Sequence, residues 1–214
     1  MQKTYFFDLD GTLVSSVNPV KQVFREYLAQ HYHFELTEEF WKTELAARGY
    51  MADMQFLKER FQDPTPAEEM MQEFYSRIIP KYESEIFFKP HAKEFLQKLH
   101  DSGVKTYLFS ASPMCMITPC LKNNGAEHLF TGIISVDRYS PLTKRDVALW
   151  QQAAKDCGID AKDAVIFEDN VVPIQTALKA GYTVYAVKDV QPKTDFELLE
   201  RIAHHVVYDY AELL

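Results

Sequence analysis

The sequence predicts an α/β protein with a Rossmann-like parallel sheet core and a second, all-helical domain inserted after the first strand. Short and nearly continuous apolar runs recur along the chain, which is typical of strands buried on both faces of a parallel sheet. Segments with helical spacing of apolar residues lie between these runs, so that strands and helices alternate. The alternation is interrupted once, over residues 16–87, where helical patterns follow one another without a strand.

The strands of the core are expected where the apolar runs lie. Residues 3–9 (KTYFFDL) run into Asp10-Gly11, and such a dipeptide is typical of a tight turn after a strand. Further strands are expected at 105–110, 132–136, 164–167, 183–187 and 205–208, and core helices at 92–100, 147–157 and 172–180. Gly158 and Gly181 follow the last two helices, at the position where a left-handed C-cap favours glycine.

The inserted segment is expected to hold four helices, at 19–32, 37–49, 51–61 and 66–82. Thr37 is a suitable N-cap for the second helix, and Pro66 suits the first turn of the fourth. Two proline-containing junctions, Asn18-Pro19 and Lys89-Pro90, are the expected hinges. The prediction is therefore a core domain of residues 1–15 and 88–214 and a helical domain of residues 16–87.

Composition excludes several classes of protein. Hydrophobic residues make up 47% of the 214, which is enough for a packed core, and the formal net charge of −8 comes without a basic run, so nucleic acid is not an expected partner. No stretch approaches the roughly 18 apolar residues of a membrane span, and the N-terminus does not have the pattern of a secretory signal. The three cysteines lack CxxC spacing and are expected to be free thiols, so a cytoplasmic location is predicted.

The strongest motif is Asp8-Leu9-Asp10-Gly11-Thr12, at the end of the first predicted strand. Residues two apart in a strand point to the same face, so Asp8 and Asp10 are expected to direct two carboxylates into one crevice. In a parallel sheet the crevice beyond the carboxyl ends of the strands is where ligands bind. An acidic site at this edge of the sheet is therefore predicted.

The chain resembles the haloacid dehalogenase-like (HAD) hydrolase superfamily, and four motifs in the family's order carry the resemblance. After Asp8 and Asp10 come Ser110 in YLFSAS, Lys144 in SPLTKRD, and Glu168-Asp169 in VIFEDN. The helical insert is similar to the alpha-helical cap of the phosphatase branch, which lies after the first motif. Lys144 is not followed by the Pro-x-Pro that relatives often have, and Lys122, Lys155 and Lys162 are other basic residues in this half of the chain.

The resemblance implies a role for each motif residue. Asp8 is expected to attack phosphorus and form an aspartyl-phosphate, and Asp10 to act as general acid and then general base. Mg²⁺ is expected on Asp8, the backbone carbonyl of Asp10 and Asp169, with Glu168 next to it or linked through water. Lys144 is expected to offset the carboxylates and to orient Asp8 and the substrate. Ser110, with backbone N–H groups such as that of Ala111, is expected to bind phosphoryl oxygens.

Residues of the inserted helices are candidates for recognising the substrate. Arg48-Gly49-Tyr50 lies at a break between two predicted helices, where Arg48 is expected to hold an anionic group and Tyr50 to stack on a substrate ring. These residues can equally be interpreted as a helix C-terminus, at which Arg48 is a favourable cation and Gly49 ends the helix.

The leading functional prediction is a Mg²⁺-dependent phosphomonoesterase that acts on a small phosphorylated metabolite. A phosphosugar mutase similar to β-phosphoglucomutase is the alternative, but Val14 to Asn18 lacks the His or Lys that a mutase acid/base would use. A non-catalytic binding protein is the third, and it is disfavoured because Asp8 and Asp10 are both intact. Dehalogenation is disfavoured by Asp10, because that reaction has no leaving alkoxide to protonate. The sequence does not choose among sugar phosphates, phosphoglycolate and nucleotide monophosphates as the substrate.

Overall fold

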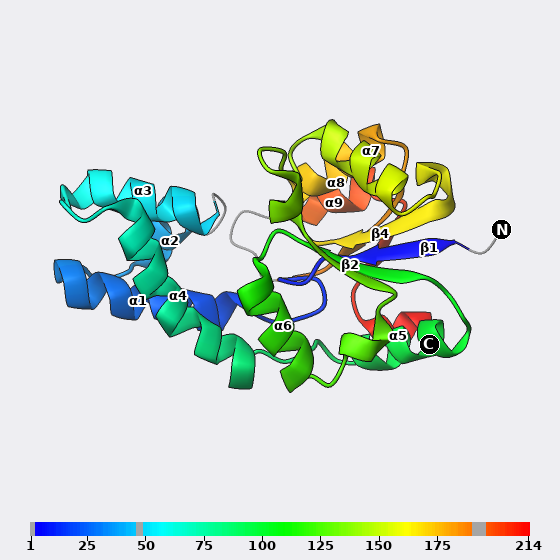
Figure 1. The fold of residues 1–214 in the computed structure, drawn as a ribbon, viewed down its shortest axis with the longest axis horizontal. Helices are drawn as coiled ribbons and strands as arrows, with labels where there is room; N and C mark the ends of the chain where they lie inside the picture. The colour runs from blue at the N-terminus through cyan, green and yellow to red at the C-terminus, as the bar shows by residue number, and fades with distance from the viewer. Residues whose placement is uncertain (1–2, 46–48, 190–195) are drawn as a thin grey trace.

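The computed structural model describes residues 3–45, 49–189 and 196–214 (Figure 1). Within these ranges the chain forms a six-stranded sheet in the order β3-β2-β1-β4-β5-β6, and every neighbouring pair is parallel. The strands are β1 (Thr4–Phe7), β2 (Thr106–Ser110), β3 (Gly132–Ser135), β4 (Ala164–Glu168), β5 (Thr183–Val187) and β6 (His205–Val207). Because β1 lies between β2 and β4, the carboxyl ends of these three strands meet in the middle of one edge.

Helices cover both faces of the sheet, as near-continuous apolar strands require. They are α5 (Ala92–Asp101), α6 (Met114–Asn123), α7 (Val147–Asp156), α8 (Val171–Lys179) and α9 (Phe196–Ile202). Short 3₁₀ helices are η1 (Glu127–Leu129), η2 (Val136–Tyr139), η3 (Ala161–Asp163) and η4 (Tyr210–Leu213). In Figure 1, α7, α8 and α9 lie on one face and α5 on the other. Phe6 and Phe7 of β1 accordingly join two different apolar clusters, one on each face.

The segment between β1 and α5 is helical and lies beside the sheet (Figure 1). Its described helices are α1 (Val17–Tyr32), α2 (Glu38–Glu44), α3 (Tyr50–Phe61) and α4 (Ala67–Ser84). Phe24 of α1 is buried and packs against Phe74 of α4 and Trp41 of α2, with ring centroids 4.6 and 5.7 Å away. These aromatic contacts give the helical segment apolar packing of its own.

The two chain connections between the helical segment and the sheet run side by side. Ser15 N donates to the Phe87 carbonyl at 3.3 Å, and Lys89 N donates to the Leu13 carbonyl at 2.8 Å. Val14 and Phe88 form an antiparallel bridge between these bonds. The helical segment therefore leaves and rejoins the core at one place.

The predicted fold class, a Rossmann-like parallel sheet, is confirmed, and the structure corrects several boundaries. β1 ends at Phe7 rather than residue 9: Asp8 N still donates to the Phe167 carbonyl at 3.0 Å, after which the chain turns. The predicted helix 37–49 ends at Glu44, because the backbone of Leu45 is extended and its side chain is buried in the apolar cluster. Helices α6 and α9 were not predicted, since Pro119 interrupts the pattern of α6 and α9 has only 7 residues. None of the described helices has the length and apolar character needed to span a membrane.

Candidate active site

A cavity of about 880 Å³ lies where the carboxyl ends of β1, β2 and β4 face the helical segment. The sheet contributes to the wall of this cavity residues that end its strands or come shortly after them. Among them are Asp8, Asp10, Ser110, Ala111, Ser112, Glu168 and Asp169. The opposite wall comes from α1, α2, α3 and α4. The predicted crevice at this edge of the sheet is thus present, and the helical segment covers it.

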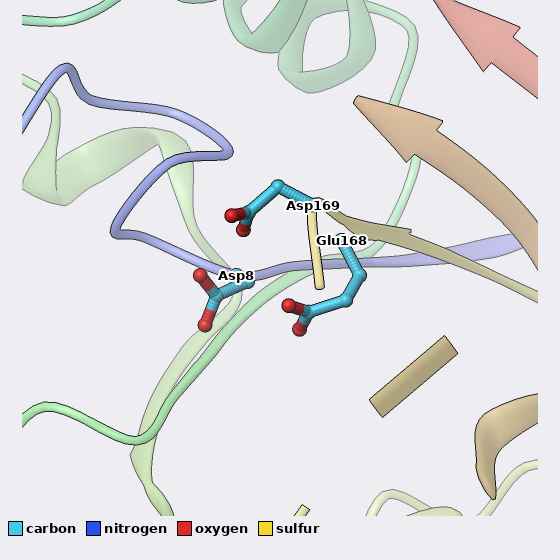
Figure 2. Close-up of side chains that lie close together, drawn as sticks. All are labelled: Asp8, Glu168 and Asp169. Atoms are coloured by element: carbon cyan, nitrogen blue, oxygen red, sulfur yellow. The ribbon is translucent and has the colours of Figure 1, made fainter. Parts of the chain in front are cut away.

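Three buried carboxylates gather in the cavity (Figure 2). Asp8 follows β1, while Glu168 and Asp169 lie at the end of β4, and each offers one oxygen within 4.8 Å of the others. Their exposed fractions are 7%, 2% and 3%. Because β1 and β4 are hydrogen-bonded neighbours, two segments about 160 residues apart in sequence bring these groups together.

Lys144, from the loop before α7, neutralises part of this charge. Its Nζ donates to Asp8 Oδ1 at 2.5 Å and to Glu168 Oε2 at 2.7 Å, and the lysine is buried. The Lys144 carbonyl accepts hydrogen bonds from Thr176 Oγ1 at 2.6 Å and Trp150 Nε1 at 3.3 Å, which hold the loop. The other candidate lysines, at 122, 155 and 162, are not among the described residues that line the cavity.

Burial dominates the titration of this cluster. Burial raises the pKa of Asp8 to about 8, Lys144 opposes that rise, and Glu168 and Asp10 add to it. Burial lowers the pKa of Lys144, but the charges of Asp8 and Glu168 overcome this and raise it above its ordinary value. The proton of the Asp8–Lys144 pair therefore stays on the lysine. Burial, followed by the neighbouring carboxylates Glu168 and Asp8, also raises the pKa of Asp169.

Asp10 does not join the cluster of three carboxylates. Its Oδ1 accepts a hydrogen bond from the Tyr82 hydroxyl at 2.5 Å, and its Oδ2 accepts one from the Ser112 hydroxyl at 2.6 Å. Tyr82 is fully buried on α4, and burial, followed by the charge of Asp10, raises the pKa of its hydroxyl, which therefore remains a donor. The helical segment thus contacts the second carboxylate of the first motif.

Neither partner of Asp10 was predicted from the sequence. Ser112 stands two residues beyond Ser110 in the same FSAS stretch, and this spacing could have identified it as a second hydroxyl at the end of β2. No pattern distinguishes Tyr82 from the other apolar and aromatic positions of its helix. Only the tertiary structure brings Tyr82 of α4 to Asp10.

The turn after β1 requires glycine at position 11. Gly11 has a φ of +83°, and a Cβ there would lie 2.7 Å from Asp169 Cγ, closer than any side chain tolerates. The next residue, Thr12, donates from Oγ1 to Asp169 Oδ1 at 3.0 Å. The motif's Gly-Thr pair therefore lets the backbone approach Asp169 and orients its carboxylate.

The predicted substrate-binding residues lie at different depths. The Ser110 hydroxyl is buried and accepts from Ser112 N at 3.0 Å, while Ala111 is exposed on the cavity wall. Tyr50 begins α3, lines the cavity, and packs on Phe74 with ring centroids 5.2 Å apart. Arg48 lies outside the described residues. The catalytic, metal and substrate roles assigned to these residues stay predictions.

The donor set fits a hard divalent cation. Asp8, Glu168 and Asp169 offer only oxygen, and oxygen ligands at close range are what Mg²⁺ and similar ions prefer. Asp8 and Asp169 lie on the cavity wall, so a bound ion would face a ligand there. The side chain of Asp10 has Tyr82 and Ser112 as partners, so any contribution of Asp10 to a metal would come from its backbone carbonyl, as predicted.

The fold and site define a hydrolase with a carboxylate centre at the end of a parallel sheet. The chain belongs to the haloacid dehalogenase-like hydrolase family, whose model matches residues 2–181. It is 26% identical over 181 residues, 85% of this chain and 81% of the relative, to YhcW of Bacillus subtilis (strain 168), which is named as a candidate phosphatase. It is also 26% identical over 188 residues to the bifunctional riboflavin kinase/FMN phosphatase of Arabidopsis thaliana, covering 87% of this chain but about half, 48%, of that protein.

Solved structures share the fold. CbbY from Rhodobacter sphaeroides in complex with phosphate matches with a TM-score of 0.84 at 18% identity, covering 100% of this chain and 96% of that one. A HAD family hydrolase from Deinococcus radiodurans with bound phosphate and sodium matches with a TM-score of 0.75 at 22% identity, covering 99% and 93% of the two chains. The predicted membership of the HAD superfamily is confirmed.

Proposed function

We propose that this protein is a Mg²⁺-dependent phosphomonoesterase that hydrolyses a small phosphorylated metabolite through an aspartyl-phosphate on Asp8. The observation that carries the proposal is the buried cluster of Asp8, Glu168 and Asp169, joined by Lys144 and facing a cavity large enough for such a metabolite. A second carboxylate, Asp10, lies on the same cavity wall with different partners. Two carboxylates in different environments are suited to different roles.

Mg²⁺ would be held by Asp8 and Asp169 and the backbone carbonyl of Asp10, with Glu168 beside it. When bound, the ion supplies Lewis-acid stabilisation of charge on the phosphoryl group and shields it from the carboxylates. Lys144 holds Asp8 Oδ1, which fixes the direction of the nucleophile, and its positive charge favours the ionised form of Asp8. With the ion bound, Asp8 would be both oriented and ionised for attack.

The reaction has two displacements. In the first, an Asp8 oxygen forms a bond to phosphorus, the bond from phosphorus to the leaving oxygen breaks, and Asp10 gives its proton to the leaving alkoxide. In the second, Asp10 takes a proton from water, the water oxygen bonds to phosphorus, and the bond to Asp8 breaks to release phosphate. The Ser110 hydroxyl and the Ala111 backbone N–H would bind phosphoryl oxygens during both steps.

Residues 16–87 are proposed to act as a cap domain that closes over the substrate. Both connections between this segment and the core run side by side at one place, which supports hinge motion there. Side chains of α1–α4 form the cavity wall opposite the carboxylates. That wall is mainly aromatic and apolar and includes Phe24, Trp41, Tyr50, Met51, Met71 and Tyr75. A closed cap would exclude bulk water from the aspartyl-phosphate.

Hydrolysis is favoured over a mutase reaction by the same wall. A mutase needs an acid/base group on the cap, typically His or Lys, to return the phosphate to a sugar. Among the described residues that line the cavity from the helical segment there is no His or Lys. The names of similar proteins agree with a phosphate ester as substrate: one is a bifunctional riboflavin kinase/FMN phosphatase, and a mutant of CbbY was crystallised with xylulose-1,5-bisphosphate. The proposal includes the predicted location in the cytoplasm and the prediction that nucleic acid is not a partner.

The test is phosphate release from p-nitrophenyl phosphate by wild type and Asp8→Asn, with Mg²⁺ and with EDTA. We expect release that needs Mg²⁺ and that Asp8→Asn lowers by about 10³-fold or more, because a nucleophile has been removed. Asp101→Asn, an exposed carboxylate on α5, is the matched control and should keep wild-type activity. Absence of release by folded wild type, together with interconversion of glucose 1- and 6-phosphates, would favour the mutase. Absence of both would favour a binding protein.

A further inference from the structure

A second buried ion pair lies beside the carboxylate cluster. Lys89 Nζ is 2.9 Å from Asp189 Oδ1, with the two side chains 11% and 6% exposed. Lys89 stands where the helical segment rejoins the core, and Asp189 lies two residues beyond the end of β5. Neither residue belongs to the four motifs of the sequence.

The ammonium group of Lys89 is fully used. Besides Asp189, it donates to the Gly11 carbonyl in the turn after β1 and to the Lys188 carbonyl at 3.0 Å. An ammonium group has three protons, so each has an acceptor. Lys89 therefore ties the turn of the first motif to the segment that carries Asp189.

Asp189 is next to Asp169. The space that a Cβ at Gly11 would occupy is bordered by Asp169 Cγ at 2.7 Å and by Asp189 Oδ2 at 2.9 Å, so both carboxylates flank the same glycine. Asp189 Oδ2 is buried and has no hydrogen-bond donor among the described residues. A buried carboxylate oxygen without a donor is costly unless water or a ligand supplies one.

The charges around the site do not balance without a cation. Four carboxylates with side chains under a tenth exposed, those of Asp8, Glu168, Asp169 and Asp189, face two ammonium groups, those of Lys144 and Lys89. When all six groups are ionised, four negative and two positive charges leave two negative charges, which one divalent ion would neutralise. The Asp189 carboxylate thus contributes to the negative charge around such an ion.

We propose that Asp189, held by Lys89, is a positioning residue for the divalent ion at Asp8, Glu168 and Asp169. Its Oδ1 is engaged by Lys89, and its Oδ2 accepts a hydrogen bond from water bound to the ion. Carboxylates outside the direct ligands commonly change metal affinity by about 10–100-fold. The inference rests on the proposed Mg²⁺ site but adds to it a residue that follows β5.

The experiment is isothermal titration of Mg²⁺ into the substrate-free protein. Asp189→Asn keeps the shape of the side chain, and we expect it to weaken Mg²⁺ binding at least about tenfold. Asp101→Asn, the exposed control, should bind as wild type does. Lys89→Met leaves Asp189 in place without its partner and should weaken binding about threefold, a smaller effect in the same direction.

Mg²⁺ binding by Asp189→Asn within twofold of wild type would overturn the proposal, even if that variant is less stable to heat, because a purely structural role moves stability alone. If Asp189→Asn does not fold, Lys89→Met decides, and unchanged affinity there also overturns it. Wild type that binds no Mg²⁺ would overturn both this inference and the proposed function. Wild type that binds Mg²⁺ and hydrolyses p-nitrophenyl phosphate, with unaffected variants, would overturn the inference alone.

Discussion

The two walls of the cavity differ in chemistry. The wall made by the sheet carries buried charges at the ends of β1 and β4, each with a partner such as Lys144. The wall made by α1–α4 carries rings and thioethers, with Asp53 and Glu68 as its acidic groups among the described residues. Under the proposed function, the core would hold the reacting groups and the helical segment would select the alcohol half of the substrate.

A contact at Asp10 crosses this division. Tyr82 belongs to the helical segment but donates to Asp10, the expected general acid/base. A movement of the helical segment away from the sheet would break this bond. Tyr82 is therefore a residue through which the helical segment can affect Asp10. The substitutions that follow test whether the core and the helical segment otherwise have separate roles.

Lys144→Met tests the charged wall and should have the largest effect. It leaves Asp8 and Glu168 buried without their cation, and breaking a buried ion pair costs about 3–5 kcal/mol of stability. Urea unfolding measures the loss, and Mg²⁺ should restore part of it. Lys162→Met, at an exposed lysine paired with Asp160, should leave stability close to that of wild type, because exposed ion pairs contribute little. Equal losses of stability in both variants would show that the buried ion pairs of Lys144 contribute no more to stability than an exposed ion pair does.

Asp10→Asn tests whether the second carboxylate acts in the chemistry. A general acid/base contributes about 10²–10⁴-fold to the rate, so kcat should fall by that factor while folding is retained. The asparagine oxygen can still accept from Tyr82, and its NH₂ group can donate to the Ser112 hydroxyl oxygen instead of accepting from it, so the local structure should persist. Steady-state kinetics with p-nitrophenyl phosphate and circular dichroism measure both quantities. A loss below about fivefold would contradict the assigned role.

The pH dependence of Mg²⁺ binding tests the burial of the cluster. Because the pKa of Asp8 is raised to about 8, a proton occupies this ligand at lower pH in the metal-free protein and must leave when Mg²⁺ binds. Affinity should therefore rise with pH, by up to about tenfold per unit below pH 8, and level off above it. Titration calorimetry at pH 6, 7, 8 and 9 measures this. Affinity that does not change between pH 6 and 8 would contradict it.

Tyr82→Phe tests the contact that crosses the division. The substitution removes only the hydroxyl that donates to Asp10, and we expect kcat to fall about tenfold, the equivalent of one hydrogen bond to a charged group. Tyr32→Phe removes a similar bond, from the Tyr32 hydroxyl to Asp63 at 2.8 Å, within the helical segment. It should leave kcat unchanged. Equal effects of the two variants would assign the loss to stability of the helices instead.

Met51→Ala tests the apolar wall and should have the smallest effect. Met51 lines the cavity and is 45% exposed, so its loss should disturb packing little. We expect KM for p-nitrophenyl phosphate to rise about three- to fourfold with kcat unchanged, which corresponds to one buried methylene group. Met114→Ala, equally exposed on α6 but outside the described cavity lining, is the control. A fall in kcat for Met51→Ala would show that the apolar wall also contributes to the chemical step, which would contradict the separation of roles between the two walls.

Much of the site was predictable because its residues follow strands. Asp8, Ser110 and the Glu168-Asp169 pair each end an apolar run, and parallel strands bring such ends to one edge whatever the details of packing. The expectation that Asp8 and Asp10 act as neighbours on one strand face was less accurate. β1 ends before Asp8, and the turn at Gly11 sends the Asp10 carboxylate toward Tyr82 and Ser112 instead.

The sequence by itself determined the fold class, the family and the order of the motif residues, because hydrophobic periodicity and strand-end positions are local properties of the chain. The tertiary structure decided which groups hold the carboxylates. Tyr82 and Ser112 are 72 and 102 residues from Asp10, and Asp189, which follows β5, pairs with Lys89, which precedes α5. Such contacts depend on how helices cross the strand ends, and no local pattern records that crossing.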